Sequence, residues 1–378
     1  MSTSPLRVVW LQSPPWKGVW TRQNHFARRI VRDGGEVLYV ENPSAIGTRL
    51  REEYTRLLST SPENYEAEPG IHLLKLPLQL PGGDRHEIVG QFNGWRFART
   101  VSSWLDQAGW SDYLAWCRLP NAVHALSHLS PRFTVYDVTD DYEFYARNEK
   151  ERAITQRLEA KLAGRADRIF TTTTALADKL RTINQNVLNI PNGVDKAFFD
   201  TPSKEKMPLA EIASPRIGYI GIVASWMDFD LLEKLGQRWP GQIIIIGPVK
   251  SEVKARFHAI PGLVHIDHIP HLDVPRYLAA FDVCILPHQL TELRHRADPL
   301  KLVEYLASGK PIVTVALRSA MPYRDLMDLA DNHDSFLASV TDRLKNPNAD
   351  LASARRAAAR LRDWDQLYDQ VRQHLPDA

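Results

Sequence analysis

The stretch Asp298-Pro-Leu-Lys-Leu-Val-Glu-Tyr-Leu-Ala-Ser-Gly-Lys-Pro311 is the most informative part of this sequence. Asp298 is a residue type that caps helices, Pro299 suits a first helical position, and Gly309 is a common helix end. The apolar run at 281–287 precedes this helix, and another apolar run follows it. A strand, a helix and a second strand in this order predict a parallel βαβ unit.

The same alternation extends over most of the chain. The expected strands are residues 7–11, 36–40, 71–76, 112–116, 132–137, 168–171, 187–190, 216–220, 242–246, 263–266, 282–286 and 311–315. The clearest helical patterns are 22–33, 86–107, 147–164, 228–238, 251–258, 273–280 and 298–308. Continuous apolar strands separated by helices indicate parallel sheets covered on both faces. The sequence therefore predicts an α/β protein with two doubly wound, Rossmann-like domains.

The alternation is interrupted once, by a polar stretch between Asp195 and Pro215. We expect an N-terminal domain at 1–198 and a linker at 199–215. We expect a C-terminal domain at 216–348 and a helix at 349–378 that could cross back to the first domain. Ligands of such folds bind outside the carboxyl ends of the strands, so the expected site is a cleft between the two sheet edges.

Composition narrows the function classes. The 378 residues include 47 Lys and Arg against 45 Asp and Glu, a formal charge of +2. This balance argues against an extended nucleic-acid surface, and we expect no nucleic-acid partner. The two cysteines exclude a disulfide framework and favour a reducing compartment. With no signal-peptide pattern and no long apolar run, the expected location is the cytoplasm.

One predicted helix has a sequence that is compatible with binding to a membrane surface. Residues 86–107 carry Phe92, Trp95 and Trp104 beside the basic side chains of Arg96 and Arg99. An aromatic face with basic flanks could rest on the inner face of an anionic membrane. The alternative is an ordinary amphipathic helix buried against the sheet.

Lys301 is unusual for its position. A cation in the first turn of a helix opposes the helix dipole, which favours anions there. The placement is explained if a phosphate occupies the helix N-terminus, held by backbone N–H groups and by the ammonium group. Glu304, one turn further on, could then accept hydrogen bonds from a ribose diol. The alternative is a Lys–Glu pair on a solvated helix face.

These motifs resemble those of GT-B glycosyltransferases of the GT4 type. The resemblance covers 281–311, the segment 189–195 that ends their N-terminal domain, and the segments 218–221 and 224–228 that open their nucleotide domain. It implies two domains that face each other across a cleft, the N-terminal one on the acceptor side and the C-terminal one binding the donor. It also implies a sugar transfer from a nucleotide sugar without metal or other cofactor. By this resemblance Lys301 would hold the donor pyrophosphate, Glu304 the ribose, and Gly221 a close backbone loop beneath the nucleotide. The predicted donor-binding residues are Gly221, Arg294, Arg296, Leu300, Lys301 and Glu304.

The sequence departs from the GT4 pattern at two points. These enzymes usually carry a second Glu eight residues before the Glu304 position, where this chain has Arg296. They also often carry a basic pair after the Gly221-like loop, which is missing here. Arg294 and Arg296 could supply that charge from the neighbouring loop, or they could lie on a solvated loop.

Three carboxylates follow one expected strand of the first domain. Asp137 closes the strand, and Asp140 and Asp141 lie on the loop beyond it. A positioned Asp can take the proton of an attacking sugar hydroxyl, although an Asp pair can also cap a helix. The segment is distantly similar to the base-bearing segment of the glucuronosyltransferases of xanthan assembly, which implies Asp140 as the base and Asp141 as the second candidate. A true base at Asp140 implies inversion, whereas GT4 enzymes retain the anomeric configuration, and both outcomes stay open.

The loop after the first strand offers acceptor or sugar contacts. It looks like the corresponding loop of bacterial polysaccharide glycosyltransferases. Gly18 allows close backbone approach, and Arg22 and His25 could bind a sugar. The ordinary polarity of a helix start explains these residues equally well.

The sequence thus predicts a hexosyltransferase-like enzyme of polysaccharide biosynthesis. Its donor would be a nucleotide-diphosphate sugar, with UDP favoured and GDP possible, and its acceptor a saccharide or a lipid-linked saccharide. No metal site is expected. Two alternatives remain: a nucleotide-sugar epimerase on the same scaffold, and a catalytically silent sugar- or nucleotide-binding protein.

Overall fold

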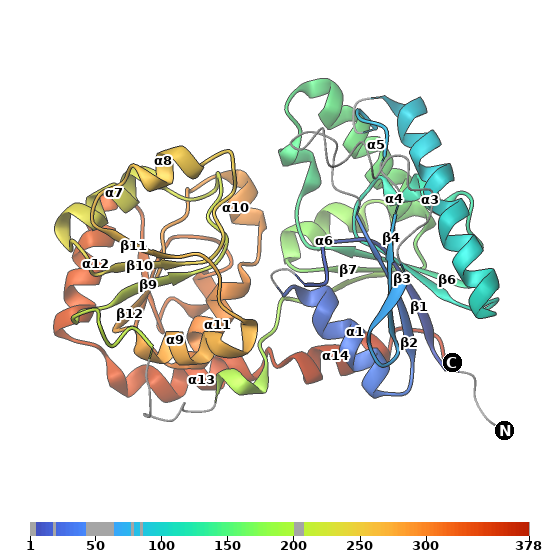
Figure 1. Ribbon diagram of the computed structural model, residues 1–378. Coiled ribbons are helices and arrows are strands. Elements are labelled where there is room, and N and C mark those ends of the chain that lie inside the picture. The colour runs from blue at the N-terminus through green and yellow to red at the C-terminus, as the bar shows by residue number, and fades with distance from the viewer. Residues whose placement is uncertain are drawn as a thin grey trace. The chain divides into compact units, whose positions relative to one another are not determined.

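The computed structural model describes residues 5–17, 20–42, 64–76, 79–83, 86–199 and 208–377. The chain divides into two compact units (Figure 1). Met1–Ile190 and Tyr368–Ala378 form the first, and Pro191–Leu367 form the second. The division therefore falls earlier than the expected boundary at residue 198. Part of the expected linker lies outside the described residues.

The described part of the first unit contains an eight-stranded sheet in the order β3-β4-β2-β1-β5-β6-β7-β8. Neighbouring strands are parallel except for β3 and β4. The strands are β1 (Arg7–Ser13), β2 (Glu36–Glu41), β3 (Asn64–Glu68), β4 (Ile71–Lys75), β5 (Leu114–Cys117), β6 (Phe133–Val138), β7 (Arg168–Thr171) and β8 (Val187–Asn189). The helices are α1 (Arg22–Arg32), α3 (Glu87–Ala108), α4 (Ala122–Leu126), η1 (Tyr142–Tyr145), α5 (Glu149–Arg165) and α6 (Thr174–Arg181). The strand order reverses between β1 and β5, where doubly wound sheets bind ligands.

The second unit contains a six-stranded parallel sheet in the order β11-β10-β9-β12-β13-β14. The strands are β9 (Ile217–Ile220), β10 (Ile243–Ile246), β11 (Leu263–Ile266), β12 (Val283–Leu286), β13 (Ile312–Val315) and β14 (Asp328–Ala330). The helices are η2 (Lys196–Phe198), α7 (Phe229–Arg238), α8 (Lys254–His258), η3 (His271–Asp273), α9 (Val274–Ala280), α10 (Glu292–Arg296), α11 (Leu300–Ser308), η4 (Met321–Tyr323), α12 (His333–Lys345), η5 (Ala349–Leu351) and α13 (Ala352–Arg360). The last helix, α14 (Trp364–Arg372), begins in the second unit and ends in the first. Here the strand order reverses between β9 and β12.

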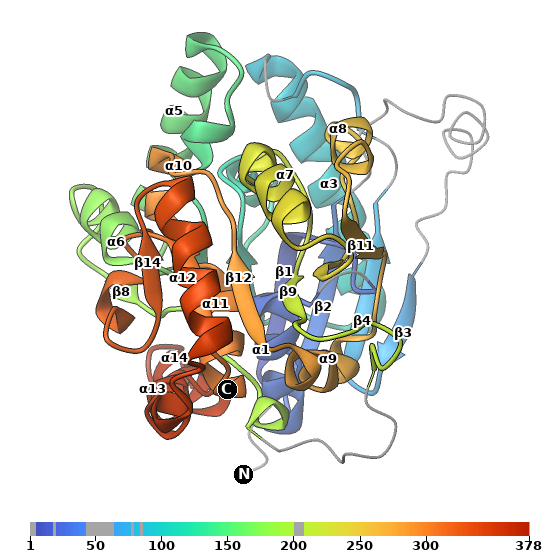
Figure 2. The ribbon, with the colours of Figure 1, turned by 90° about the vertical axis from the view of Figure 1, so that its left-hand side faces the viewer.

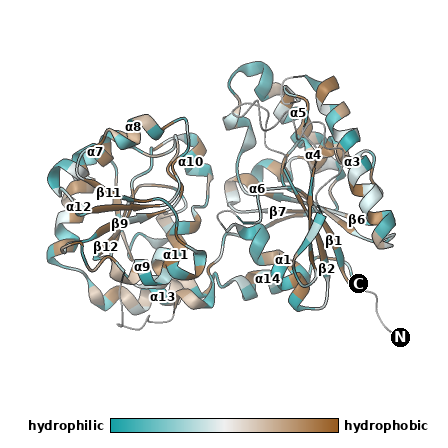
Figure 3. Ribbon diagram, in the orientation of Figure 1, coloured by the Kyte–Doolittle hydropathy of each residue, from teal (hydrophilic) through white to brown (hydrophobic). Residues whose placement is uncertain are grey.

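Apolar strands form the interior of each unit, and polar helix faces cover them (Figure 3). β10, for example, consists of four fully buried isoleucines. In the second unit, α12 lies against β12, β13 and β14, and α11 packs against α9 and α13 (Figure 2). The predicted fold class, two doubly wound α/β units, is confirmed. Among the described residues, no helix is both long and apolar enough to cross a membrane.

The C-terminal segment differs from the single helix expected at 349–378. It is broken after Arg360 into α13 and α14. Asp363, in the break, forms a β-bridge with Val194. Beyond the break, the Tyr368 ring packs against Phe26 of α1, with ring centres 6.4 Å apart. The end of the chain therefore completes the first unit, and α14 lies beside α1 in Figure 1.

Candidate functional site

Two glycines shape the carboxyl edge of the second sheet. Gly221 follows β9, and its N–H donates to the Ile246 carbonyl at 2.8 Å. A Cβ at Gly221 would lie 2.6 Å from the Tyr219 hydroxyl oxygen. A Cβ at Gly247, which has a φ of +139°, would lie 2.1 Å from the Gly221 carbonyl oxygen. Only glycine fits this close approach of the β9 and β10 ends.

Tyr305 joins α11 to the same edge. Its hydroxyl accepts a hydrogen bond from the Ile220 N–H at 2.9 Å. Burial raises the Tyr305 pKa well above its ordinary value, so the phenol stays protonated. This bond anchors the second turn of α11 at the end of β9, the strand that flanks the switch point.

Lys301 and Glu304 form an ion pair on α11. The Lys301 Nζ donates to Glu304 Oε2 at 2.7 Å. Their side chains are only 15% and 2% exposed. The pair expected as the alternative interpretation is therefore formed, but on an enclosed face of the helix rather than a solvated one. An enclosed pair in the first turns of a helix is costly to desolvate, so it calls for an explanation beyond surface charge.

Asp298 does not cap α11, contrary to expectation. The residue at the N-cap is Pro299, and no side chain caps this helix. The Asp298 carboxylate instead accepts a hydrogen bond from the Asn192 N–H at 2.8 Å and forms a buried ion pair with Arg362. The sequence interpretation failed because the competing cation lies far along the chain.

Arg294 is turned inward. Its Nη2 donates to His288 Nδ1 at 3.2 Å, and its guanidinium carbon lies 5.8 Å from the centre of the Trp226 ring. The Arg296 side chain is 30% exposed, and its Nε lies 4.0 Å from Glu292 Oε2. Leu300 is the first residue of α11 and is half-buried. Arg294 therefore does not lie on a solvated loop.

A pocket of about 470 Å³ opens at this edge of the sheet. Its lining follows β9, β12, β13 and β14 and comprises Asp228, Leu231, Lys234, His288, Leu290, Val315, Asp331, Asn332, His333 and Asp334. Its size is within the range of small-molecule sites. The pocket adjoins the switch point, and Lys301 and Glu304 are not part of its lining.

His288 was missed at the sequence level, although its place directly after a buried strand was a usable signal. The residue is 3% exposed, and its Nε2 has no hydrogen-bond partner among the described residues. Burial, assisted by the Arg294 charge, lowers the His288 pKa well below its ordinary value. The ring is therefore neutral. Because Nδ1 accepts from Arg294, the proton is on Nε2.

In the first unit, Asp137 and Arg22 form a buried ion pair. Arg22 Nη2 lies 3.1 Å from Asp137 Oδ1, and both side chains are almost completely buried. Arg22 Nη1 also donates to the Ile190 carbonyl at 2.7 Å. Burial raises the pKa of Asp137, opposed by the Arg22 charge. Arg22, a predicted sugar contact, is thus enclosed and paired within its own unit.

Asp140 and Asp141 lie in different environments. Asp141 is 1% exposed, and its Oδ1 lies 2.5 Å from Lys179 Nζ. Lys179 also pairs with Glu143 and Glu159, so Asp141 belongs to a buried charge network. Asp140 is half-buried and accepts hydrogen bonds from the hydroxyls of its neighbours on the same loop, Thr139 and Tyr145. Of the two, only Asp140 has no ion pair with a described residue.

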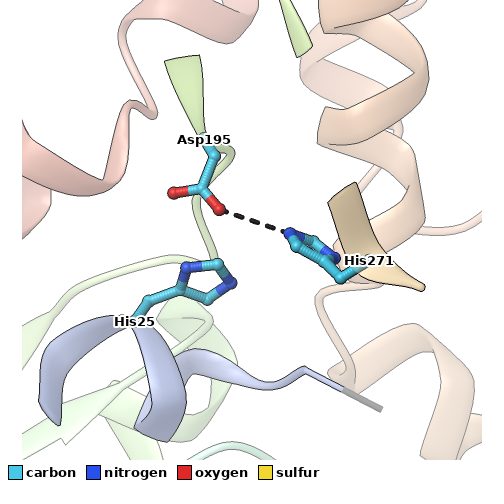
Figure 4. A group of neighbouring side chains, drawn as sticks. All are labelled: His25, Asp195 and His271. Carbon is cyan, nitrogen blue, oxygen red and sulfur yellow. Dashed lines mark hydrogen bonds and ion pairs between the residues drawn. The ribbon is translucent and has the colours of Figure 1, made fainter. Parts of the chain in front are cut away.

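The remaining predicted contacts are His25 and Gly18. His25 is buried on α1, with its ring centre 5.4 Å from that of Trp20. Gly18 lies outside the described residues. In the second unit, Asp195 Oδ2 lies 3.3 Å from His271 Nε2, which ties the segment after Pro191 to η3 (Figure 4).

Comparisons of the sequence and of the fold with known proteins both find glycosyltransferases. Residues 216–346 match the family model described as glycosyl transferases group 1. Solved structures of similar fold include the sucrose-phosphate synthase of Thermosynechococcus elongatus, at a TM-score of 0.73 and 14% identity over 97% of this chain and 98% of that one. The chain has the GT-B fold, and residues 216–346 of it resemble group 1 glycosyl transferases. The predicted family resemblance is confirmed.

Two further GT-B structures and one curated protein are similar. Anabaena HepE in complex with UDP and glucose has a TM-score of 0.69 at 17% identity, over 98% of this chain and 99% of that chain. WaaG, a glycosyltransferase involved in lipopolysaccharide biosynthesis, has a TM-score of 0.65 at 14% identity, over 97% of this chain and 98% of that chain. TuaH of Bacillus subtilis strain 168, assigned as a glycosyltransferase of teichuronic acid biosynthesis, is 26% identical over 59% of this chain. That match spans 60% of TuaH.

Proposed function

We propose that this GT-B protein transfers a sugar from a nucleotide-diphosphate sugar to a saccharide acceptor, free or lipid-linked. The enclosed Lys301–Glu304 pair at the start of α11 carries the proposal. It lies in the domain that matches the glycosyltransferase family. UDP is the favoured nucleotide, supported by the HepE structure in complex with UDP. The similarity to TuaH supports a role in building a polysaccharide.

The donor binds the second unit. A diphosphate at the N-terminus of α11 would draw the Lys301 ammonium away from Glu304, because the phosphate charge is larger and the helix dipole adds to it. The Glu304 carboxylate, released from that pair, would accept hydrogen bonds from the ribose hydroxyls. Gly221 lets the β9 loop approach the nucleotide closely. The ion pair thus keeps both groups satisfied until the donor arrives.

Asp140 acts as the base on the acceptor. It takes the proton of the attacking hydroxyl while the new oxygen–carbon bond forms at the anomeric carbon and the bond to the diphosphate oxygen breaks. The nucleoside diphosphate leaves with the electron pair of that bond. A single displacement of this kind inverts the anomeric centre. Asp140 is favoured over Asp141 because Asp141 is already paired with Lys179.

The donor assignment is tested by thermal shift with UDP, GDP, ADP and dTDP. We expect at least one to raise the melting temperature, because ligand binding stabilises the folded state. Lys301→Ala, in a Glu304→Gln background so that no buried carboxylate is left alone, should lose that rise. Lys254→Ala changes an exposed lysine of the same unit and should keep it. No stabilisation of the wild-type chain by any of the four nucleotides would refute the proposal.

One observation favours a second candidate. Arg296 stands where GT4 enzymes usually have a Glu, which fits a binding protein without turnover. Release of nucleoside diphosphate only when acceptor is present separates the transferase from this binding protein and from an epimerase. We also propose that the reaction needs no metal, so turnover should persist in excess EDTA.

We further propose that the protein works in the cytoplasm at the inner face of a membrane. Three apolar residues of α3 at helical spacing are exposed: Ile88 at 81%, Phe92 at 45% and Trp95 at 42%. The Arg99 guanidinium carbon lies 5.7 Å from the centre of the Trp95 ring. This face combines apolar and cationic groups, as surfaces that rest on anionic lipid do. A lipid-linked acceptor would be presented there.

A further inference from the structure

Arg118 lies beside the proposed base. It follows β5 directly, and the preceding Cys117 is the register partner of Tyr136 in β6. Because β6 leads into the loop that carries Asp140, Arg118 and Asp140 lie at the same edge of the sheet. The Arg118 guanidinium carbon is 5.9 Å from the centre of the Tyr142 ring.

The Tyr142 hydroxyl links Arg118 to the base. It lies 3.1 Å from the Thr139 hydroxyl, which in turn donates to Asp140 Oδ2 at 3.2 Å. The charges of Tyr142 and Asp140 raise the pKa of Arg118. The arginine and the proposed base therefore share one local environment.

Arg118 has no direct charged partner, and the neighbouring carboxylate that acts on it is Asp140. Arg118 is half-buried, and it makes no hydrogen bond or ion pair with any residue in the described ranges. Two of the neighbouring carboxylates are paired elsewhere, Asp137 with Arg22 and Asp141 with Lys179, which leaves only Asp140, the proposed base, among these three. A half-buried guanidinium that lacks a partner is costly unless something else pairs with it. An oxyanion is the ligand that a guanidinium fork binds best.

Gln12 supplies a second, independent sign of a ligand. It lies at a bulge near the end of β1, with a φ of +58° that is uncommon outside glycine. It is 5% exposed, and its Oε1 has no partner among the described residues. Leu11 and Cys117 are register partners, so the next residues, Gln12 in β1 and Arg118 after β5, are neighbours at the switch point of the first sheet. Strain and an orphan acceptor together are typical of a binding site.

We propose that this edge of the first unit is an anion-binding acceptor subsite, which rests on the proposed function. Arg118 binds a phosphate or carboxylate group carried by the acceptor saccharide. Gln12 Oε1 accepts a hydrogen bond from one of the acceptor's hydroxyls. Both groups hold the acceptor next to Asp140, so the substrate is an anionic saccharide rather than a neutral one.

Calorimetric titration of the full chain tests this subsite. The probes are glucose 6-phosphate, glucuronic acid and glucose, each added in the presence of saturating UDP. We expect one or both anionic sugars to bind at least tenfold more tightly than glucose, and added salt to reduce that preference. The phosphate and carboxylate arms show which oxyanion is recognised. Arg118→Gln should abolish the preference, whereas Arg157→Gln, on the exposed surface of the same unit, should keep it.

The outcomes separate this subsite from the proposed function. If glucose binds wild-type protein as tightly as both anionic sugars do, the subsite is refuted whether or not the variants fold. The same holds if a folded Arg118→Gln chain keeps the preference. If UDP binds but the anionic preference is absent, only the subsite fails. If the preference depends on Arg118 but no nucleotide binds, the subsite stands and the transferase assignment fails.

Discussion

At the scale of single residues, the neighbours Asp140 and Asp141 are expected to have different roles, Asp140 in turnover and Asp141 in the stability of the fold. Asp140→Asn should lower turnover by about 10²–10⁴-fold, because a neutral amide cannot take the hydroxyl proton. Donor affinity, measured by the UDP-induced thermal shift, should not change. Asp141→Asn removes a charged partner of Lys179 and should lower the free energy of unfolding by about 1–3 kcal/mol. Full turnover by Asp140→Asn would move the base elsewhere.

His288 makes stability depend on pH. Its folded-state pKa lies well below the ordinary value of 6.5. Below pH 6.5 the unfolded chain therefore takes up a proton that the folded chain refuses, and stability falls as pH falls. The loss from this group approaches about 1.4 kcal/mol for each pH unit. In urea denaturation, His288→Gln should lose less stability than wild type between pH 7.5 and pH 5.5. Equal losses would mean that His288 takes up its proton normally in the folded state.

At the scale of one element, α3 gives a prediction about membranes. Phe92→Ser together with Trp95→Ser should weaken sedimentation with anionic lipid vesicles at least tenfold, since each aromatic ring contributes apolar area on burial in the lipid. Leu361→Ser alters an apolar residue elsewhere that is even more exposed, and it should leave binding unchanged. If the wild-type chain does not sediment with these vesicles, the proposed membrane contact is wrong.

The local hydrophobic pattern predicted most helices and strands, whereas the remaining ones depend on contacts with residues far away in the sequence. Runs such as Ile243–Ile246 are apolar along their whole length and could only be buried strands. β3, with the sequence NYEAE, carries too few apolar residues to be recognised without its partner β4. The C-terminal helix is broken where Asp363 bridges Val194, far back in the chain. The helical propensity of residues 349–378 could not predict this break, because the break depends on a contact with a distant residue.

The candidate site followed the same rule. The Lys301–Glu304 pair is local, one turn apart, and was expected from the sequence as an alternative. Asp298 was assigned as a cap because its partner Arg362 is 64 residues away. The unpaired guanidinium of Arg118 was equally invisible, since it depends on which cations reach Asp137 and Asp141. Residue spacing predicts ion pairs within one helix, whereas tertiary contacts between distant segments decide which charged residues pair with each other.

At the scale of the whole molecule, the two units should unfold separately in calorimetry. Tyr368→Ala removes a buried ring from the first unit and should lower the melting temperature of one transition, by a loss of about 3–5 kcal/mol. Phe336→Ala empties a comparable position in α12 of the second unit and should lower only the other transition. A single transition that both substitutions shift alike would contradict this division.

The Asp298–Arg362 pair also sets an order of events during synthesis. Arg362 pairs with Asp298, which lies just before α11, and Tyr368 with the residues after it completes the first unit. A nascent chain that ends at residue 350 lacks Arg362 and Tyr368, so both units are unfinished, although the described strands of both sheets have already been synthesised. Nascent chains arrested there should be far more sensitive to protease than chains that include residues 351–378, and they are the form for which a chaperone would compete.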